Sequence, residues 1–117
     1  MSDRAVLYQS QITGREPGWV YRVQGVKFDG YDAGRGVLLD AKGLGYARFV
    51  DNASGIFKSW WRGSNGLLDE AQRQITAANG IPIEWHVAEE QAYNAISSLL
   101  NGNGIQTIQV IFTPPLP

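Results

Sequence analysis

The sequence contains no cysteine, and this absence excludes several classes of protein. A disulfide-stabilised scaffold and any thiolate metal site both require cysteine side chains. The chain has one histidine, so a zinc site built from nitrogen and sulfur ligands is not expected. A Ser–His or Cys–His catalytic triad is not expected either, because cysteine is absent and no serine motif accompanies the histidine.

The chain also lacks an excess of either charge and any long apolar segment. Its 10 basic and 11 acidic side chains give a formal net charge of -1, which argues against a domain that holds nucleic acid by bulk electrostatics. No apolar run approaches the ~20 residues that span a bilayer. The first residues lack the basic and apolar regions of a secretory signal. The length of 117 residues suits one domain over 1–117.

Glycine is frequent instead, and the 14 glycines divide the chain into short segments. Apolar periodicity predicts helices over 4–12, 67–79 and 88–100. Apolar alternation predicts strands over 19–29, where a tight turn at Gly25 makes two strands, and over 37–42, 81–87 and 105–112. The connecting segments 30–36 and 43–66 are predicted to be a turn and a long irregular stretch. The order αβββαβαβ predicts an α/β (α+β) fold with a mixed central sheet flanked by helices.

Two acidic residues and a lysine lie at the ends of predicted strands. Because side chains alternate along a strand, Asp40 and Lys42 share one face. Asp29 ends the preceding strand, and pairing of the two strands would bring Asp29 and Asp40 to one edge of the sheet. Two carboxylates at close separation repel each other unless a cation lies between them. The pattern favours a Mg²⁺ or Mn²⁺ site, and the alternative is a surface Asp–Lys pair on an edge strand.

Blocks of sequence around these residues resemble one family. They are Val26–Gly30, Leu38–Gly43, Ala71–Gln74 and Pro82–His86. In this order they are similar to the restriction-endonuclease-fold toxin family 5 of polymorphic bacterial toxins, within the PD-(D/E)xK nuclease superfamily. The resemblance implies a restriction-endonuclease-like core over nearly the whole chain.

The resemblance also implies a function. It points to a Mg²⁺- or Mn²⁺-dependent nuclease toxin that cuts DNA, with Asp29 and Asp40 as metal ligands, the Ala41 carbonyl as a further ligand, and Lys42 acting at the attacking water or the phosphate. Such domains are typically carried by longer effector proteins, often secreted by a type VI system into rival bacteria. There they act in the cytoplasm of the target cell, whereas a cognate immunity protein protects the producer. The alternatives are an RNase on the same fold and an inactive protein-binding module.

Three further residues are candidates for the site: Gln74 for a catalytic role, and His86 and Glu16 for a supporting one. Gln74 interrupts the apolar stripe of the predicted helix 67–79, so its amide is expected to bond the site carboxylates, Lys42 or a substrate phosphate. The alternative for Gln74 is a position at the edge of the stripe that reaches solvent. His86 shares a strand face with Glu84, and a structural role is the favoured interpretation. Glu16 is a weak candidate for the additional acidic residue that many superfamily members carry on the first helix.

Residues of the segment 43–66 are candidates for nucleic-acid contact. Lys58 and Arg62 are expected to approach the phosphate backbone, and Trp61 to stack on bases. Because adjacent side chains cannot both face the same way, one of Trp60 and Trp61 is expected to pack in the core. Residues 42–66 carry four basic side chains against one acidic, whereas 67–117 carry one against five. The balanced net charge therefore conceals a basic central segment beside the predicted site.

Overall fold

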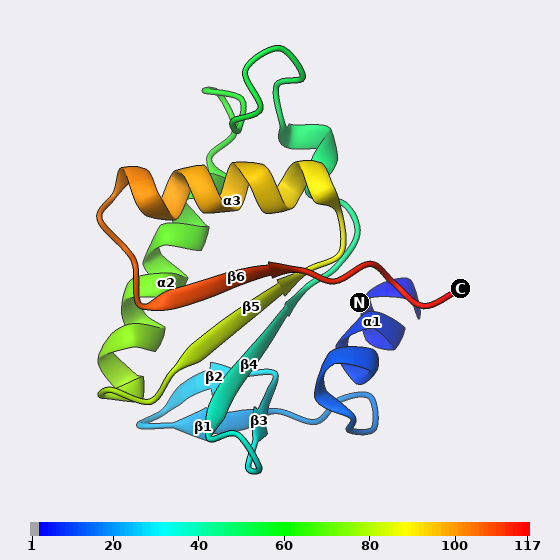
Figure 1. The fold of residues 1–117 in the computed structure, drawn as a ribbon, viewed down its shortest axis with the longest axis vertical. Helices are drawn as coiled ribbons and strands as arrows, with labels where there is room; N and C mark the ends of the chain where they lie inside the picture. Colours follow the sequence, from blue (N-terminus) through cyan, green and yellow to red (C-terminus); the bar gives the residue numbers. More distant parts are fainter. Residues whose placement is uncertain (1–2) are drawn as a thin grey trace.

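The computed structural model describes residues 3–117, which form an α+β fold (Figure 1). The helices are α1 (Asp3–Thr13), α2 (Gly63–Ala78) and α3 (Glu90–Gly102), with a short 3₁₀ helix, η1 (Ala47–Phe49). The strands are β1 (Tyr21–Val23), β2 (Val26–Phe28), β3 (Gly30–Asp32), β4 (Val37–Lys42), β5 (Ile83–Val87) and β6 (Ile108–Phe112). No helix within residues 3–117 is long and apolar enough to cross a membrane.

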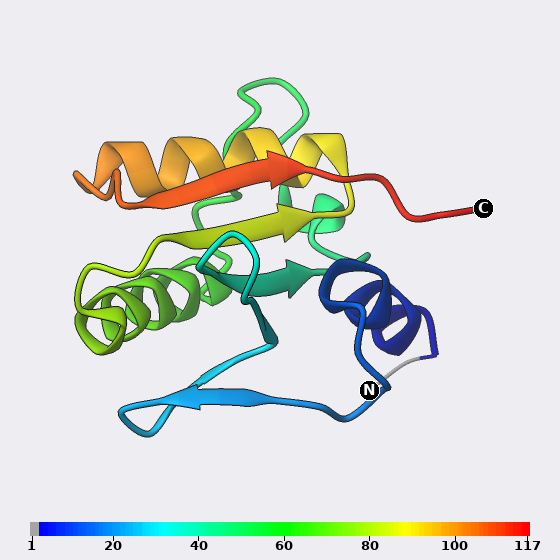
Figure 2. The same cartoon turned by 60° about the horizontal axis from the view of Figure 1, so that its bottom comes forward.

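The central sheet has the order β3-β4-β5-β6. Strand β3 is antiparallel to β4, whereas β4, β5 and β6 run parallel to one another. The parallel pairs need crossover connections, which α2 and α3 provide. Strands β1 and β2 form a separate antiparallel hairpin, which projects below the sheet in Figure 2. The predicted mixed sheet flanked by helices is therefore confirmed.

One face of the sheet forms the core with α2 and α3. Because side chains alternate, Leu38 of β4 lies on the same face as Ile83, Trp85 and Val87 of β5. All four are at most 3% exposed. They pack against the apolar faces of the two crossover helices, which contribute Leu67, Ala71, Ala78, Ala92, Ala95, Ile96 and Leu100. Asp40 and Lys42 follow Leu38 on this face, so the packing of the core leads directly to the polar residues at the end of β4.

Helix α1 lies beside the carboxyl ends of the parallel strands, next to the C-terminal tail (Figure 1). The hydroxyl of Tyr8 donates a hydrogen bond of 2.7 Å to the Thr113 carbonyl, and the amide of Gln11 donates one of 3.0 Å to the Pro114 carbonyl. Tyr8 is 2% exposed. These contacts fix α1 at the sheet end where the candidate residues of β4 lie.

The segment 30–36 is not only the turn that the sequence predicts. Residues Gly30–Asp32 form β3, and Asp32 pairs with Val37. The glycines of this segment suggest a turn. Gly30, however, is needed because another part of the chain packs closely against its backbone. A Cβ there would lie 2.9 Å from the side chain of Thr13. The turn itself is confined to the residues after β3 and closes with a hydrogen bond of 2.7 Å from the Gly36 amide to the Asp32 carbonyl.

Helix α2 begins four residues earlier than predicted, inside the segment 43–66. Its first turn is Gly63-Ser-Asn-Gly66, a composition of low helix propensity that hides the helix from a sequence reading. Glycine is needed at position 63, since a Cβ there would lie 2.2 Å from the ring of Trp61. The predicted tight turn at Gly25 is confirmed, and the predicted end of the helix at residue 79 is correct to within one residue. Gln24 and Gly25 have φ of 50° and 78°, as in a type I′ hairpin turn, and left-handed Asn79 ends α2.

Candidate active site

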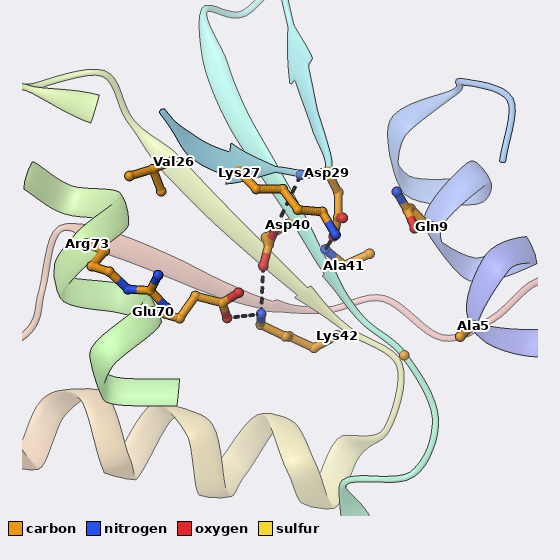
Figure 3. A pocket seen from close by; sticks show the side chains of 11 residues that line it. Ala5, Gln9, Val26, Lys27, Asp29, Asp40, Ala41, Lys42, Glu70 and Arg73 are labelled. Atoms are coloured by element: carbon orange, nitrogen blue, oxygen red, sulfur yellow. Dashed lines mark hydrogen bonds and ion pairs between the residues drawn. The ribbon is translucent and has the colours of Figure 1, made fainter. Parts of the chain in front are cut away.

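The side chains of Asp29, Asp40 and Lys42 line one pocket of about 410 Å³ (Figure 3). Four elements form its walls: α1 contributes Ala5 and Gln9, β2 contributes Val26 and Lys27, β4 contributes Asp40–Lys42, and α2 contributes Glu70 and Arg73. The pocket opens beside the carboxyl end of β4. Clefts at the carboxyl ends of parallel strands are the usual binding positions of α/β sheets.

Asp29 and Asp40 meet by a different route from the one predicted. Asp29 lies at the bend between β2 and β3, and its amide donates to the Leu39 carbonyl at 3.0 Å and to Asp40 Oδ1 at 3.3 Å. Asp29 Oδ2 in turn accepts a hydrogen bond of 2.8 Å from the Ala41 amide. The two aspartates are therefore brought together by this bend and not by the expected pairing of β2 with β4. Each carboxylate accepts a hydrogen bond from the backbone of the other segment.

The two carboxyl groups are buried and interact electrostatically. Asp29 is 9% exposed and Asp40 is 4% exposed. Burial raises the pKa of Asp29, and the nearby charge of Asp40 raises it further, to about 6 from an ordinary value of 3.8. The fold therefore holds one carboxylate in a position where its negative charge is unfavourable without an added cation.

Lys42 lies beside Asp40 on the same face of β4. Its Nζ donates to Asp40 Oδ2 at 2.6 Å and also to Glu70 Oε1, and it lies 4.3 Å from the centre of the Trp85 ring. Burial by itself lowers the pKa of Lys42, but the charges of Asp40 and Glu70 outweigh this effect, and the pKa is raised above its ordinary value. Lys42 is consequently an ammonium ion at neutral pH, suited to donating hydrogen bonds and stabilising negative charge.

The sequence reasoning missed four polar residues of the pocket. Glu70 precedes Gln74 by one turn of α2, and it is not among the functional residues proposed from the sequence. Lys27 and Arg73 lie in the blocks that carry the family resemblance, but the sequence assigns neither of them a role at the site. Gln9 of α1 is buried, and its Nε2 donates a hydrogen bond of 3.0 Å to the Trp19 carbonyl. A signal exists for Glu70 alone, since residues four apart share a helix face.

Gln74 is placed in the core rather than in the pocket. It is fully buried, and its Oε1 accepts a hydrogen bond of 2.8 Å from the indole N–H of Trp85. Its Nε2 lies 3.5 Å from the Lys27 carbonyl. The amide is hydrogen-bonded, as its position in the apolar stripe requires, but its partners are neither the site carboxylates nor Lys42. Gln74 instead links α2 to β5 and β2, two elements that carry or support the pocket.

His86 lies on the face of β5 opposite to the core. Its Nε2 lies 2.9 Å from Glu84 Oε1, and its Nδ1 lies 2.8 Å from Thr113 Oγ1. Glu84 also accepts two hydrogen bonds from Arg35, at 2.8 and 3.0 Å. These contacts tie the turn before β4 and the C-terminal tail to β5. His86 does not line the pocket, and its contacts fit the structural role favoured from the sequence.

The remaining candidates also lie outside the pocket lining. Glu16 is exposed in the loop after α1. Trp61 is packed between aromatic rings, with centroids 4.6 Å from Phe49 and 4.7 Å from Phe57, whereas Trp60 is 66% exposed. One tryptophan of the pair thus packs and the other faces solvent, as expected, but the packed one is Trp61, whose ring already stacks on Phe49 and was the one predicted to stack on bases. The segment that carries them with Lys58 and Arg62 lies above α3 in Figure 1.

The donor set of the pocket fits a small, hard cation. Asp29 and Asp40 supply carboxylate oxygens, and burial together with the charge of Asp40 raises the pKa of Asp29, so an added cation would favour its ionised form. Within residues 3–117 no group of three or more His, Cys, Asp or Glu side chains has the geometry of a metal site. Mg²⁺ does not require one, because it is commonly bound through one or two carboxylates with water and substrate phosphate completing the shell.

The fold and this pocket define a restriction-endonuclease-like α+β protein. The family model of restriction endonuclease fold toxin 5 matches residues 5–90, and the chain belongs to this family. The predicted resemblance is thereby confirmed, and the family indicates a nuclease toxin, a hydrolase that acts on nucleic acid. A comparison with curated proteins finds no match to the chain.

Proposed function

We propose that the chain is a Mg²⁺- or Mn²⁺-dependent DNA endonuclease toxin with its active site at Asp29, Asp40 and Lys42. The observation that carries this proposal is the pair of buried carboxylates that share a pocket with a buried lysine. The family to which the chain belongs indicates a nuclease. Toxicity, in this proposal, follows from damage to the DNA of a competing bacterium.

Asp29, Asp40 and the Ala41 carbonyl are the residues that would hold the metal ion. A bound divalent cation lowers the pKa of a coordinated water and polarises a phosphoryl oxygen. Asp29 and Asp40 orient toward the pocket through their hydrogen bonds to the backbone and to Lys42. Lys42, held as an ammonium ion, donates hydrogen bonds where negative charge develops on the phosphate. Its raised pKa favours this role over that of a general base.

Glu70 is a positioning residue in this scheme. It shares the Lys42 ammonium with Asp40 and so opposes a movement of Lys42 out of the pocket. Six charged side chains line the pocket, three cationic and three anionic. A divalent cation would therefore make the pocket positive overall, which suits a polyanionic substrate.

The proposal extends to the biology that the family implies. The domain is delivered as part of a longer effector, often through type VI secretion, and acts in the cytoplasm of the target cell. A cognate immunity protein neutralises it in the producer. Co-expression with the product of the neighbouring gene should restore growth and chromosomal DNA integrity, and continued DNA degradation would contradict this part of the proposal.

Plasmid cleavage tests the enzymatic proposal. The purified chain should nick or degrade plasmid DNA with Mg²⁺ or Mn²⁺ and should not do so in EDTA. Lys42→Ala and Asp40→Asn should each lower the rate on the order of 10²–10³-fold, as expected for loss of a preorganised charge at the reacting phosphate. Asp51→Asn, an exposed acid outside the pocket, is the matched control. Unchanged activity of either site variant would refute the assignment, and cleavage of tRNA but not plasmid would identify an RNase.

A further inference from the structure

The β1–β2 hairpin carries two cations directly opposite each other. In its antiparallel register Arg22 pairs with Lys27, and both side chains are exposed. Because side chains alternate, these two residues share one face of the hairpin, and the other face carries Tyr21, Val23, Val26 and Phe28. Phe28 is fully buried, and Val23 and Val26 pack against the core. The apolar face thus anchors the hairpin, and the cationic face is directed away from the core.

The cationic face adjoins the candidate active site. Lys27 lines the same pocket as Asp29, Asp40 and Lys42, and in the view of Figure 3 its side chain extends from β2 toward Asp29 and Ala41. The carbonyl of Lys27 lies 3.5 Å from Gln74 Nε2, which ties this part of the hairpin to α2. A group bound by Lys27 would therefore lie at the mouth of the pocket.

Lys27 differs from the other cations of the pocket lining. Lys42 is paired with Asp40 and Glu70, and Arg73 is paired with Asp69 at 3.0 Å. Within residues 3–117, neither Lys27 nor Arg22 has a carboxylate within ion-pairing distance, and Arg22 donates only to the Gly25 carbonyl at 3.4 Å. Like charges directly opposite in a sheet are destabilising. The hairpin keeps two such charges without a carboxylate partner among the described residues, and one of them, Lys27, lines the pocket.

We propose that Arg22 and Lys27 form a phosphate-binding pair that holds the backbone of the nucleic acid at the mouth of the pocket. This proposal rests on the nuclease function proposed above and identifies the surface that positions its substrate. The pair contacts phosphates and therefore contributes affinity without sequence preference. It also differs from the segment that carries Lys58 and Arg62, which does not line the pocket.

The salt dependence of binding tests the pair. Affinity for a short fluorescein-labelled DNA duplex is measured by anisotropy in EDTA, where the duplex is not cleaved. Each lost phosphate contact lowers the slope of log K against log[salt] by about 0.9, so Arg22→Gln/Lys27→Gln should lower it by about 1.8. The affinity lost between about 50 and 200 mM salt should then be about twelvefold smaller than for the unmutated chain.

Three further variants separate a specific contact from general charge. Arg22→Lys/Lys27→Arg should retain the original slope. Arg4→Gln/Arg48→Gln removes the same charge from exposed positions outside the pocket lining and should also retain it. An equal loss of slope in this control would overturn the proposal. So would an unchanged slope in Arg22→Gln/Lys27→Gln together with a reduced slope in Lys58→Gln/Arg62→Gln.

Stability and cleavage complete the test. The Arg22→Gln/Lys27→Gln variant should have a Tm equal to or above that of the unmutated chain, because a repulsive pair has been removed; a lower Tm would indicate a structural role and overturn the proposal. If the unmutated chain cleaves DNA and the variant cleaves it with the same salt dependence, only the surface assignment fails. If the unmutated chain neither binds nor cleaves nucleic acid, the nuclease function fails and the surface assignment fails with it.

Discussion

Asp29→Asn should make the protein more stable while abolishing its activity. The carboxyl group of Asp29 is 9% exposed, and burial together with the charge of Asp40 raises its pKa from 3.8 to about 6. One unit of pKa corresponds to about 1.36 kcal/mol, so the ionised carboxylate destabilises the folded state by about 3 kcal/mol above pH 6. Asparagine has no charge to bury, and its amide oxygen can still accept the hydrogen bond from Ala41.

The sign of the pH dependence follows from the raised pKa. The folded state binds the proton of Asp29 more tightly than the unfolded state, so its contribution to stability is present below about pH 4 and is lost as the pH rises through about 6. Asp29→Asn should therefore match the unmutated protein near pH 4 and exceed it by about 3 kcal/mol near pH 8. In urea unfolding this corresponds to a midpoint higher by about 1–3 M.

The measurement is urea unfolding followed by tryptophan fluorescence in EDTA at the two pH values. Asp32→Asn is a control of opposite sign, because hydrogen bonds from Arg35 lower the pKa of Asp32 and its contribution is lost as the pH falls. Mg²⁺ should stabilise the unmutated chain but not Asp29→Asn, since a ligand stabilises only the state that binds it. No gain in stability at pH 8, or the same gain at both pH values, would refute the reasoning.

Two other substitutions probe the support of the pocket. Gln74→Leu leaves the buried indole N–H of Trp85 without a partner and should lower the free energy of unfolding by about 1–3 kcal/mol. The control Gln72→Leu, at an exposed position of the same helix, should change it by less than about 0.5 kcal/mol. Equal effects of the two substitutions in urea unfolding would contradict the core role of Gln74. Glu70→Gln should slow plasmid cleavage about 10–100-fold, with the Mg²⁺ affinity measured by calorimetry unchanged. The control Glu90→Gln, at an exposed position, should cleave plasmid at the normal rate. Full activity of Glu70→Gln would contradict the positioning role of Glu70.

The features that follow from local rules were predictable from the sequence. Alternation placed Asp40 and Lys42 on one face of β4, and Asn79 marked the end of α2. The type I′ turn at Gly25 follows from the phase change of apolar residues around it. In each case the information lies within a few residues of the feature, and the backbone geometry of one element decides the outcome.

The features that depend on tertiary contacts were not predictable in the same way. Gly30, which hid β3, is needed where the side chain of Thr13 approaches the backbone closely. Lys27 and Glu70 reach the pocket from elements far apart in the sequence, so their relation to Asp40 depends on how the hairpin and α2 are placed against the sheet. The periodicity of apolar residues identifies which face of a helix or strand is buried. It does not identify the side chains of other elements that contact this face.

Gln74 shows how the core and the pocket are connected. Burial of its amide was foreseen from the apolar stripe of α2, but the partner is the indole N–H of Trp85, whose ring lies 4.3 Å from the Nζ of Lys42. The hydrogen bond restrains the ring at its edge, and the ring face supports the ammonium through a cation–π contact. A shift of α2 against the sheet would therefore displace both groups that contact the Lys42 ammonium beside Asp40, namely the Trp85 ring and Glu70. The position of Lys42 thus depends on the packing of α2 as well as on β4.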